Sequence, residues 1–226
     1  MRLAVMMSAL LAFTSVIACA QQPLSDPGIP NGETAVYSLK AGQDTAVVTQ
    51  RVAKTIKGGR AYYEVTAESS LDDIRVLIDA ATMAVEYSWV RRKRPDLVTE
   101  TETKTVKNTV KTGPDEISLA DFSGLPYVLR GFPFGRLRLV KIKMAQGSSF
   151  VMNLVNTKEV DVKTAAGTFR CYEIELGLDG FLGAFMPKSY FWFNRPAPHF
   201  LVRYQGQLAG PGSPEMVLEL SRYEVK

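Results

Sequence analysis

Residues 83–90 read MAVEYSWV, and the order of apolar and polar side chains in this stretch decides the fold class. Successive side chains of a β-strand point to opposite faces of its sheet. The residues that would share one face of a strand here are Met83, Val85, Tyr87 and Trp89. We therefore expect a strand with one aromatic-rich face that packs in a core or binds a ligand.

The same period of two recurs along most of the chain, with short turn signals such as KGGR and PGSP between the runs. The predicted strands cover 33–40, 44–54, 60–69, 73–79, 83–90, 97–110, 137–144, 150–162, 168–178, 188–194, 199–208 and 215–225. About twelve strands with almost no helical period predict an all-β fold. We expect a single curved antiparallel sheet that forms an open or closed β-barrel and so limits its exposed edges.

Two apolar stretches interrupt the strand pattern. The first, 117–135, contains two prolines and predicts a short helical or loop insertion, with Ser118 as a candidate N-cap. It fits a plug that fills one end of the barrel, a lid over an apolar cavity, or a tip that touches a membrane. The second, 177–188, holds three glycines among aromatic and aliphatic residues, and the same three roles stay open for it.

The N-terminus predicts export. Arg2 precedes the apolar run from Leu3 to Phe13, which is shorter than the roughly 20 residues of a membrane-spanning helix. VIAC (16–19) resembles a bacterial lipobox, in which Cys19 becomes the first residue and carries a diacylglyceryl group. The overlapping ACA (18–20) also fits an ordinary cleavage site before Gln21. We favour a lipoprotein signal peptide at 1–18 with lipidation of Cys19.

The mature chain is predicted to be one domain behind a spacer. Residues 19–32 are rich in proline and glycine and predict a flexible tether, so the β-barrel domain would span 33–226. The precursor has a net charge of +4, and this mildly basic charge does not by itself indicate a protein that binds nucleic acid. The run RRKR (91–94) fits a solvated strand end or a contact with anionic head groups.

The sequence carries no catalytic or metal-binding motif and implies no cofactor. His199 is the only histidine, and Cys171 is the only cysteine besides Cys19, so no intrachain disulfide can form in the mature domain if Cys19 is lipidated. A Cys171–His199 dyad would depend on the fold bringing the two together. The carboxylate pairs Asp72–Asp73 and Asp115–Glu116 are adjacent residues beside turns, where solvated ends are typical. We therefore expect a protein that is not an enzyme.

The aromatic residues are the best candidates for binding. A curved sheet with aromatic side chains on its concave face can hold an acyl chain or another apolar ligand, because ligand pockets are largely apolar. The candidate ligand-binding residues are Tyr87, Trp89, Phe122, Tyr127, Phe185, Trp192 and Tyr204.

Five stretches carry a family resemblance: GETAVYSLKAG (32–42), ISLADFSGLPYVLRGFPF (117–134), VKTAAGTFRCYEIEL (162–176), YFWFNRPAPHFLVRYQG (190–206) and LELSRYE (218–224). In this order they resemble a bacterial envelope family catalogued as domain of unknown function 3108. The resemblance implies an exported β-rich domain, with no activity or catalytic residue to carry over. The family has an aspartate-containing turn where this chain has NRPAPH (194–199). The predicted shape is also similar to the half-barrels of lipoprotein-localisation factors, which hold acyl chains.

These observations predict a lipoprotein of the bacterial outer membrane that faces the periplasm and catalyses no reaction. One partner would be the membrane, through the anchor at Cys19. The other would be either an apolar ligand, such as a lipid, or an envelope protein. The alternative is a structural or assembly module of the envelope that has no ligand cavity. A hydrolase of envelope polymers would require Cys171 and His199, or two carboxylates, to converge in a cleft.

Overall fold

The computed structural model describes residues 24–93, 98–104, 116–134, 137–144, 149–207 and 214–226. The first six strands are β1 (Glu33–Ala41), β2 (Asp44–Lys57), β3 (Arg60–Glu68), β4 (Asp72–Asp79), β5 (Val85–Lys93) and β6 (Val98–Lys104). The others are β7 (Glu116–Leu119), β8 (Leu137–Met144), β9 (Ser149–Thr164), β10 (Gly167–Leu178), β11 (Ser189–Asn194), β12 (Leu201–Gly206) and β13 (Met216–Val225). The helical turns are η1 (Phe122–Gly124), α1 (Leu125–Val128), η2 (Leu129–Gly131) and η3 (Phe181–Phe185).

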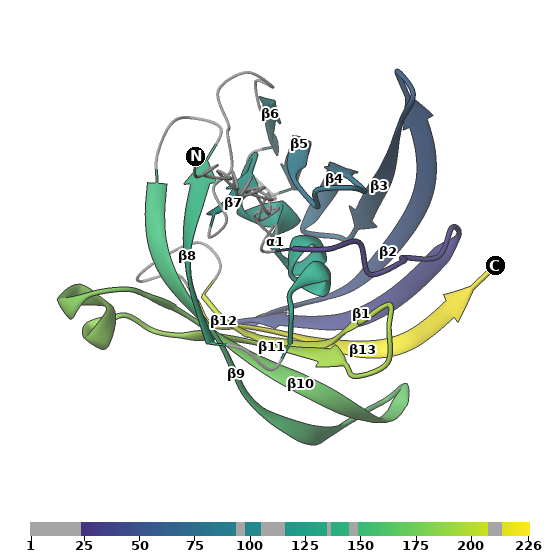
Figure 1. Ribbon diagram of the computed structural model, residues 1–226. Coiled ribbons are helices and arrows are strands. Elements are labelled where there is room, and N and C mark those ends of the chain that lie inside the picture. The colour runs from purple at the N-terminus through teal and green to yellow at the C-terminus, as the bar shows by residue number, and fades with distance from the viewer. Residues whose placement is uncertain (1–23, 94–97, 105–115, 135–136, 145–148, 208–213) are drawn as a thin grey trace, which may run out of the picture.

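The strands form one sheet in the order β6-β5-β4-β3-β2-β1-β13-β12-β11-β10-β9-β8-β7. The sheet curves strongly around α1 (Figure 1). Among the described strands, β6 and β7 are the two outer ones, so the sheet is open. The prediction of a single curved sheet in an all-β fold is confirmed, with thirteen strands where about twelve runs were expected.

The insertion predicted at 117–135 is a crossover connection. β7 and β8 run parallel to each other, unlike the other neighbouring pairs. Parallel strands cannot be joined by a tight hairpin, so the chain must cross back to the starting end between them. Residues 120–134, which we call the plug, belong to this crossing and contain η1, α1 and η2. Ser118 lies in β7 and is not the helix cap; the carboxylate of Asp121 caps η1 by accepting from the backbone N–H of Ser123.

The core lies between the curved sheet and the plug. Along β1 the buried side chains alternate, as the period of two predicts: Glu33, Ala35, Tyr37 and Leu39 are buried, and the residues between them are more exposed. β1 pairs with β13, so the first and last strands of the domain are neighbours in the middle of the sheet. The sheet therefore depends on a pairing between the two ends of the chain.

The predicted signal peptide (1–18) and Cys19 lie outside the described residues. None of the helices in the described part of the chain is long and apolar enough to cross a bilayer. The tether predicted at 19–32 is wrong over its described part, residues 24–32. Leu24 and Ile29 are buried, the backbone N–H of Ser25 donates to the carbonyl of Gly131, and Asp26 accepts a 2.6 Å hydrogen bond from Tyr63. Two apolar anchors thus fix a segment whose proline and glycine content suggested flexibility.

This packing predicts that Ile29→Ala destabilises the domain. Ile29 is fully buried, and removing a buried isoleucine side chain to alanine costs about 2–5 kcal/mol in the free energy of unfolding. Ile56→Ala is the matched control, because Ile56 is 77% exposed and its loss should cost less than about 0.5 kcal/mol. Urea denaturation of both variants measures the difference. Equal stabilities would mean that residues 24–31 do not pack on the domain.

Candidate functional site

The plug fills the concave side of the sheet with apolar side chains. Leu125, Val128 and Leu129 are fully buried. Gly124 approaches the sheet so closely that a Cβ atom at this position would lie 2.6 Å from a methyl group of Val85. At this end of the half-barrel, the space available for a ligand is therefore occupied by the chain itself.

A buried ion pair fixes the plug to the sheet. The guanidinium of Arg130 donates to both carboxylate oxygens of Glu33, at 2.6 and 2.8 Å, and the two side chains are 2% and 1% exposed. The Nε of Arg130 donates to the carbonyl of Pro198, and the hydroxyl of Tyr223 donates to Glu33 at 2.9 Å. Bidentate bonds between ionised groups are among the strongest hydrogen bonds in proteins. The plug, β1, β13 and the loop before β12 therefore meet at one polar cluster.

A second set of bonds holds the start of the plug. Asp121 accepts a 2.5 Å hydrogen bond from the hydroxyl of Ser88 in β5 and also bonds Ser123. At the other end, the carbonyl of Gly131 accepts from Ser25. The segment is held at both ends and buried between them. This geometry corresponds to the core alternative for 117–135 and not to a lid.

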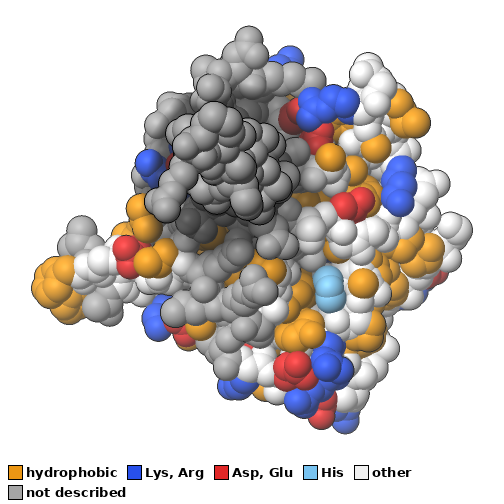
Figure 2. Space-filling view, in the orientation of Figure 1, with side chains coloured by type: hydrophobic (Ala, Val, Ile, Leu, Met, Phe, Trp, Pro, Cys, Tyr) orange, Lys and Arg blue, Asp and Glu red, His pale blue; other side chains and the backbone are white. Residues whose placement is uncertain are grey.

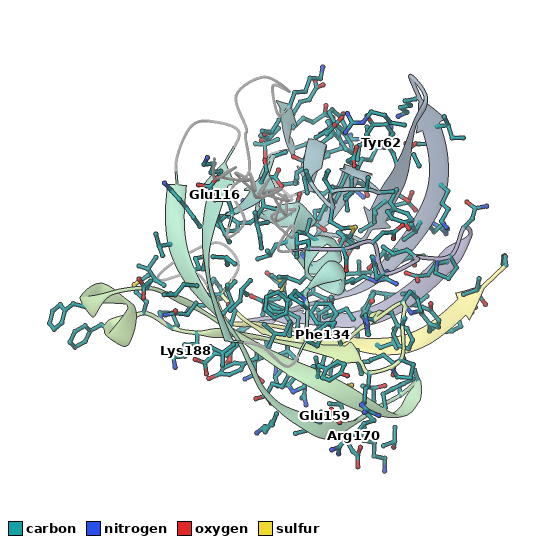
Figure 3. All side chains as sticks on the ribbon, in the orientation of Figure 1. Tyr62, Glu116, Phe134, Glu159, Arg170 and Lys188 are labelled. Atoms are coloured by element: carbon teal, nitrogen blue, oxygen red, sulfur yellow. The ribbon has the colours of Figure 1, made fainter. Side chains whose placement is uncertain are left out.

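Aromatic rings fill the concave side of the sheet next to the plug. Phe134 at the end of the plug lies between α1 and the sheet (Figure 3) and stacks on Tyr172 with ring centroids 4.5 Å apart. It also contacts Phe193 and His199. Burial raises the pKa of Tyr37 and Tyr127, so both phenols stay neutral. These rings pack against one another and leave no phenolate among them to act as a base.

The seven candidate ligand-binding residues do not gather in one cavity. Tyr127 in the plug and Tyr204 in β12 are buried, and Phe122 packs partly buried at the start of the plug. Trp192 lies half-buried on β11, where its indole N–H donates to Glu173 and the guanidinium of Arg203 lies 5.7 Å from its ring. Phe185 is exposed on η3. The structure therefore divides these residues between core and surface.

Tyr87 and Trp89 do not share a face with Val85, and this part of the prediction is wrong. Ile78 pairs with Val85 and Leu77 with Tyr87, so one extra residue, Glu86, forms a β-bulge. The bulge reverses the alternation: Val85 and Ser88 face the plug, whereas Tyr87 and Trp89 face the other side.

On that outer side, cations cover both rings. The guanidinium of Arg75 lies 5.2 Å from the ring of Trp89, and the ammonium of Lys104 lies 6.0 Å from the ring of Tyr87. Such cation–π contacts are typical of a half-exposed sheet surface. Neither ring lines the concave side.

Cys171 and His199 have separate roles. Cys171 is fully buried, and desolvation, with a smaller contribution from Asp161, raises the pKa of its thiol to about 12. His199 bonds the carbonyl of Asn194 through Nδ1 at 3.1 Å and packs its ring on Phe134, and burial lowers its pKa. A nucleophilic cysteine needs a lowered pKa, so this environment disfavours a catalytic dyad.

The acidic and basic pairs are engaged in turns and ion pairs. Asp72 bonds Ser69 in a turn, Asp73 bonds Lys93 at 2.5 Å, and Glu116 bonds Lys143 at 2.7 Å, while Asp115 lies outside the described residues. Within RRKR, Arg91 also pairs with Glu100. Across the described residues, no group of three or more His, Cys, Asp or Glu side chains is placed to hold a metal ion.

An open groove of about 680 Å³ lies where the β1–β2 hairpin passes β13 and the β3–β4 turn. Its lining residues are both polar and apolar and include Lys40, Val47, Ser70 and Glu219. None of the seven candidate residues lines this groove, and it offers no cluster of reactive groups.

The second apolar stretch, 177–188, takes a different course from the first. It forms the end of the β10–β11 hairpin, where Phe181 is 82% and Phe185 is 73% exposed. The two rings contact each other edge to face, with centroids 5.3 Å apart. We call this pair of rings on η3 the aromatic tip. Because both rings are exposed, the core role that was left open for 177–188 does not apply to them.

Sequence reasoning missed the Glu33–Arg130 pair, and its list of candidate residues included Phe185 but not Phe181. A signal for the pair exists in the sequence, because Glu33 is in phase with Ala35, Tyr37 and Leu39 on the buried face of its strand. A carboxylate on a core face requires a buried basic partner. Arg130 is the only basic residue in 117–134.

Comparison with known proteins finds no protein family that matches the chain and no curated protein that matches it. Solved structures with a similar arrangement include a β-barrel-like protein of domain of unknown function 1849 from Brucella abortus. It is 9% identical, with a TM-score of 0.41, over 90% of this chain and 99% of that one.

A LolA superfamily protein from Nitrosomonas europaea is 9% identical, with a TM-score of 0.34, over 89% of this chain and 90% of that one. A candidate lipoprotein from Parabacteroides distasonis is 11% identical, with a TM-score of 0.36, over 90% and 99% of the two chains. At these identities no residue role is carried over to this chain.

The buried ion pair predicts strong coupling between Arg130 and Glu33. Arg130→Leu should cost about 3–5 kcal/mol in the free energy of unfolding, because it leaves a buried carboxylate without its counter-charge. The double variant Arg130→Leu/Glu33→Leu should recover part of this loss, since no unpaired charge remains. Chemical denaturation of the two single variants and the double variant measures the coupling energy. Additive losses would show that the two side chains do not interact.

Burial of Cys171 predicts a thiol that resists alkylation. Its pKa is raised to about 12, so the group stays protonated at neutral and mildly alkaline pH and the reactive thiolate is scarce. Iodoacetamide should leave Cys171 unmodified in the folded protein carrying Cys19→Ser, as measured by mass spectrometry. The same protein in guanidinium is the control and should be modified. Rapid reaction of the folded protein would contradict the burial.

Proposed function

We propose that this protein is an exported, lipid-anchored domain of the bacterial envelope that catalyses no reaction and acts by contact with other envelope components. The anchor would be Cys19, at the lipobox-like VIAC, and the location the outer membrane facing the periplasm. Membership of the envelope family with domain of unknown function 3108 belongs to this proposal and rests on the five sequence stretches above.

The observation that carries the choice of function is the fixed plug. A carrier of acyl chains needs an apolar space that can open, whereas the plug is buried and is pinned by Arg130 and Glu33. This supports an interaction module more than a carrier. Contacts would then be made by exposed surface, of which the aromatic tip is the most apolar described part.

The packed N-terminal segment sets the distance between domain and membrane. Since Leu24 already belongs to the core, only residues 19–23 remain as a spacer behind the proposed anchor. Five extended residues reach about 17 Å at most. The domain would therefore work close to the membrane surface.

Cell fractionation tests the anchor. The natural chain should stay in the membrane pellet after a high-salt wash, and Cys19→Ser should move to the soluble periplasm because the acylated thiol is lost. Mass spectrometry of the membrane-bound natural chain that finds an unmodified Cys19 thiol would contradict anchoring at this residue.

Mass spectrometry of the released Cys19→Ser protein, purified without detergent, tests the choice between module and carrier. Native and denaturing spectra should give the same polypeptide mass. A lipid that is present only in the native spectrum would favour the apolar-ligand carrier instead.

A further inference from the structure

The aromatic tip is held away from the rest of the molecule. The β10–β11 hairpin ends in a helical turn that extends furthest from the body of the sheet, at the left of Figure 1, and Figure 2 shows apolar atoms at its end. Phe181 and Phe185 are among the most exposed large apolar residues described. Val151, whose carbonyl accepts from the backbone of Asp179 at the base of the turn, is also exposed.

The turn is built so that the two rings face outward. A side chain at Gly183 is excluded, because its Cβ atom would lie 1.8 Å from the carbonyl oxygen of Leu178. The backbone N–H of Gly183 donates to Gly180, and that of Met186 donates to Gly183. These bonds satisfy part of the backbone, which lowers the cost of moving the turn out of water.

Charges are absent from the sequence of the turn itself. Residues 180–187 read GFLGAFMP, and the nearest charged residues are Asp179 and Lys188 at its two ends. Lys188 lies at the base of the turn, directly before β11 (Figure 3), and pairs with Glu175 at 2.6 Å. An apolar end with charges set behind it matches the polarity gradient of a bilayer surface.

We propose that the aromatic tip inserts into the interface of a lipid bilayer and gives the anchored domain a second point of contact with the membrane. A stable protein–protein interface buries about 800 Å² on each partner and needs some 20 residues. Two rings on a narrow projection are too small for that, whereas insertion into lipid needs no complementary surface. The inference rests on the proposed envelope location, which places the chain within reach of a membrane.

Quenching of tryptophan fluorescence by brominated lipids tests whether the tip inserts into a bilayer, and it does not rely on lipidation in cells. The chain from Cys19 onward is coupled through the Cys19 thiol to a maleimide lipid in phosphatidylethanolamine and phosphatidylglycerol vesicles that contain brominated acyl chains. Phe181→Trp should be quenched well beyond the background of Trp89 and Trp192. Ile56→Trp is the matched control, since Ile56 is equally exposed at the end of the β2–β3 hairpin, and should add no quenching.

Partitioning of the uncoupled Cys19→Ser chain onto the same vesicles measures how strongly the two phenylalanines contribute to membrane binding. Each inserted phenylalanine contributes about tenfold or more to the partition coefficient. Phe181→Ser/Phe185→Ser should therefore lower the partition coefficient about a hundredfold, and Ile56→Ser should leave it unchanged.

High salt should have little effect on either measurement, because the contact is apolar. Quenching of Phe181→Trp no greater than that of Ile56→Trp would overturn the proposal, as would binding that disappears in high salt. Because the lipid is attached chemically, these results do not depend on whether cells acylate Cys19. Cell fractionation decides that question separately.

Discussion

The buried pair of Glu33 and Arg130 is the interaction on which the rest of the structure depends. Glu33 occupies a core position of β1, and an ionised carboxylate there would cost several kcal/mol without a partner. The partner comes from the plug, 97 residues away in sequence, and Tyr223 adds a hydrogen bond from β13, 190 residues away. The Glu33–Arg130 pair therefore joins the crossover, the last strand and the loop at Pro198.

Fixing the plug decides which surfaces remain for function. The concave side of the half-barrel is filled where the plug lies, and the aromatic residues that suggested a binding cavity are divided between core and outer face. The described part of the domain then combines a filled concave side with an apolar projection at η3. Under the proposed function, this projection would be the part of the domain that meets a membrane surface.

Much of this fold was predictable because alternation is a local property. Along β1 the buried residues follow the period of two, and the strands extend over nearly the ranges that the pattern marks. The bulge at Glu86 was not predictable, because an extra residue leaves the composition of the strand unchanged while it turns Tyr87 and Trp89 to the other face. The packing of Leu24 and Ile29 was missed for a related reason, since isolated anchors in a proline-rich segment have no period. Glu33 left a sequence signal, because it lies on the buried face of its strand. Which basic residue pairs with it is decided by the tertiary structure.

The pairing of β1 with β13 has a consequence for the order of events during biogenesis. A chain that crosses a membrane from its N-terminus would deliver β1 long before β13, so Glu33 would lack Arg130 until the plug emerges and Tyr223 until β13 emerges. The edge of β1 that β13 will cover also stays open, and an open edge invites pairing with other chains. Contacts so distant in sequence form slowly. Folding is thus completed only after β13 has emerged, so a chain exported in this way would need protection from aggregation until then.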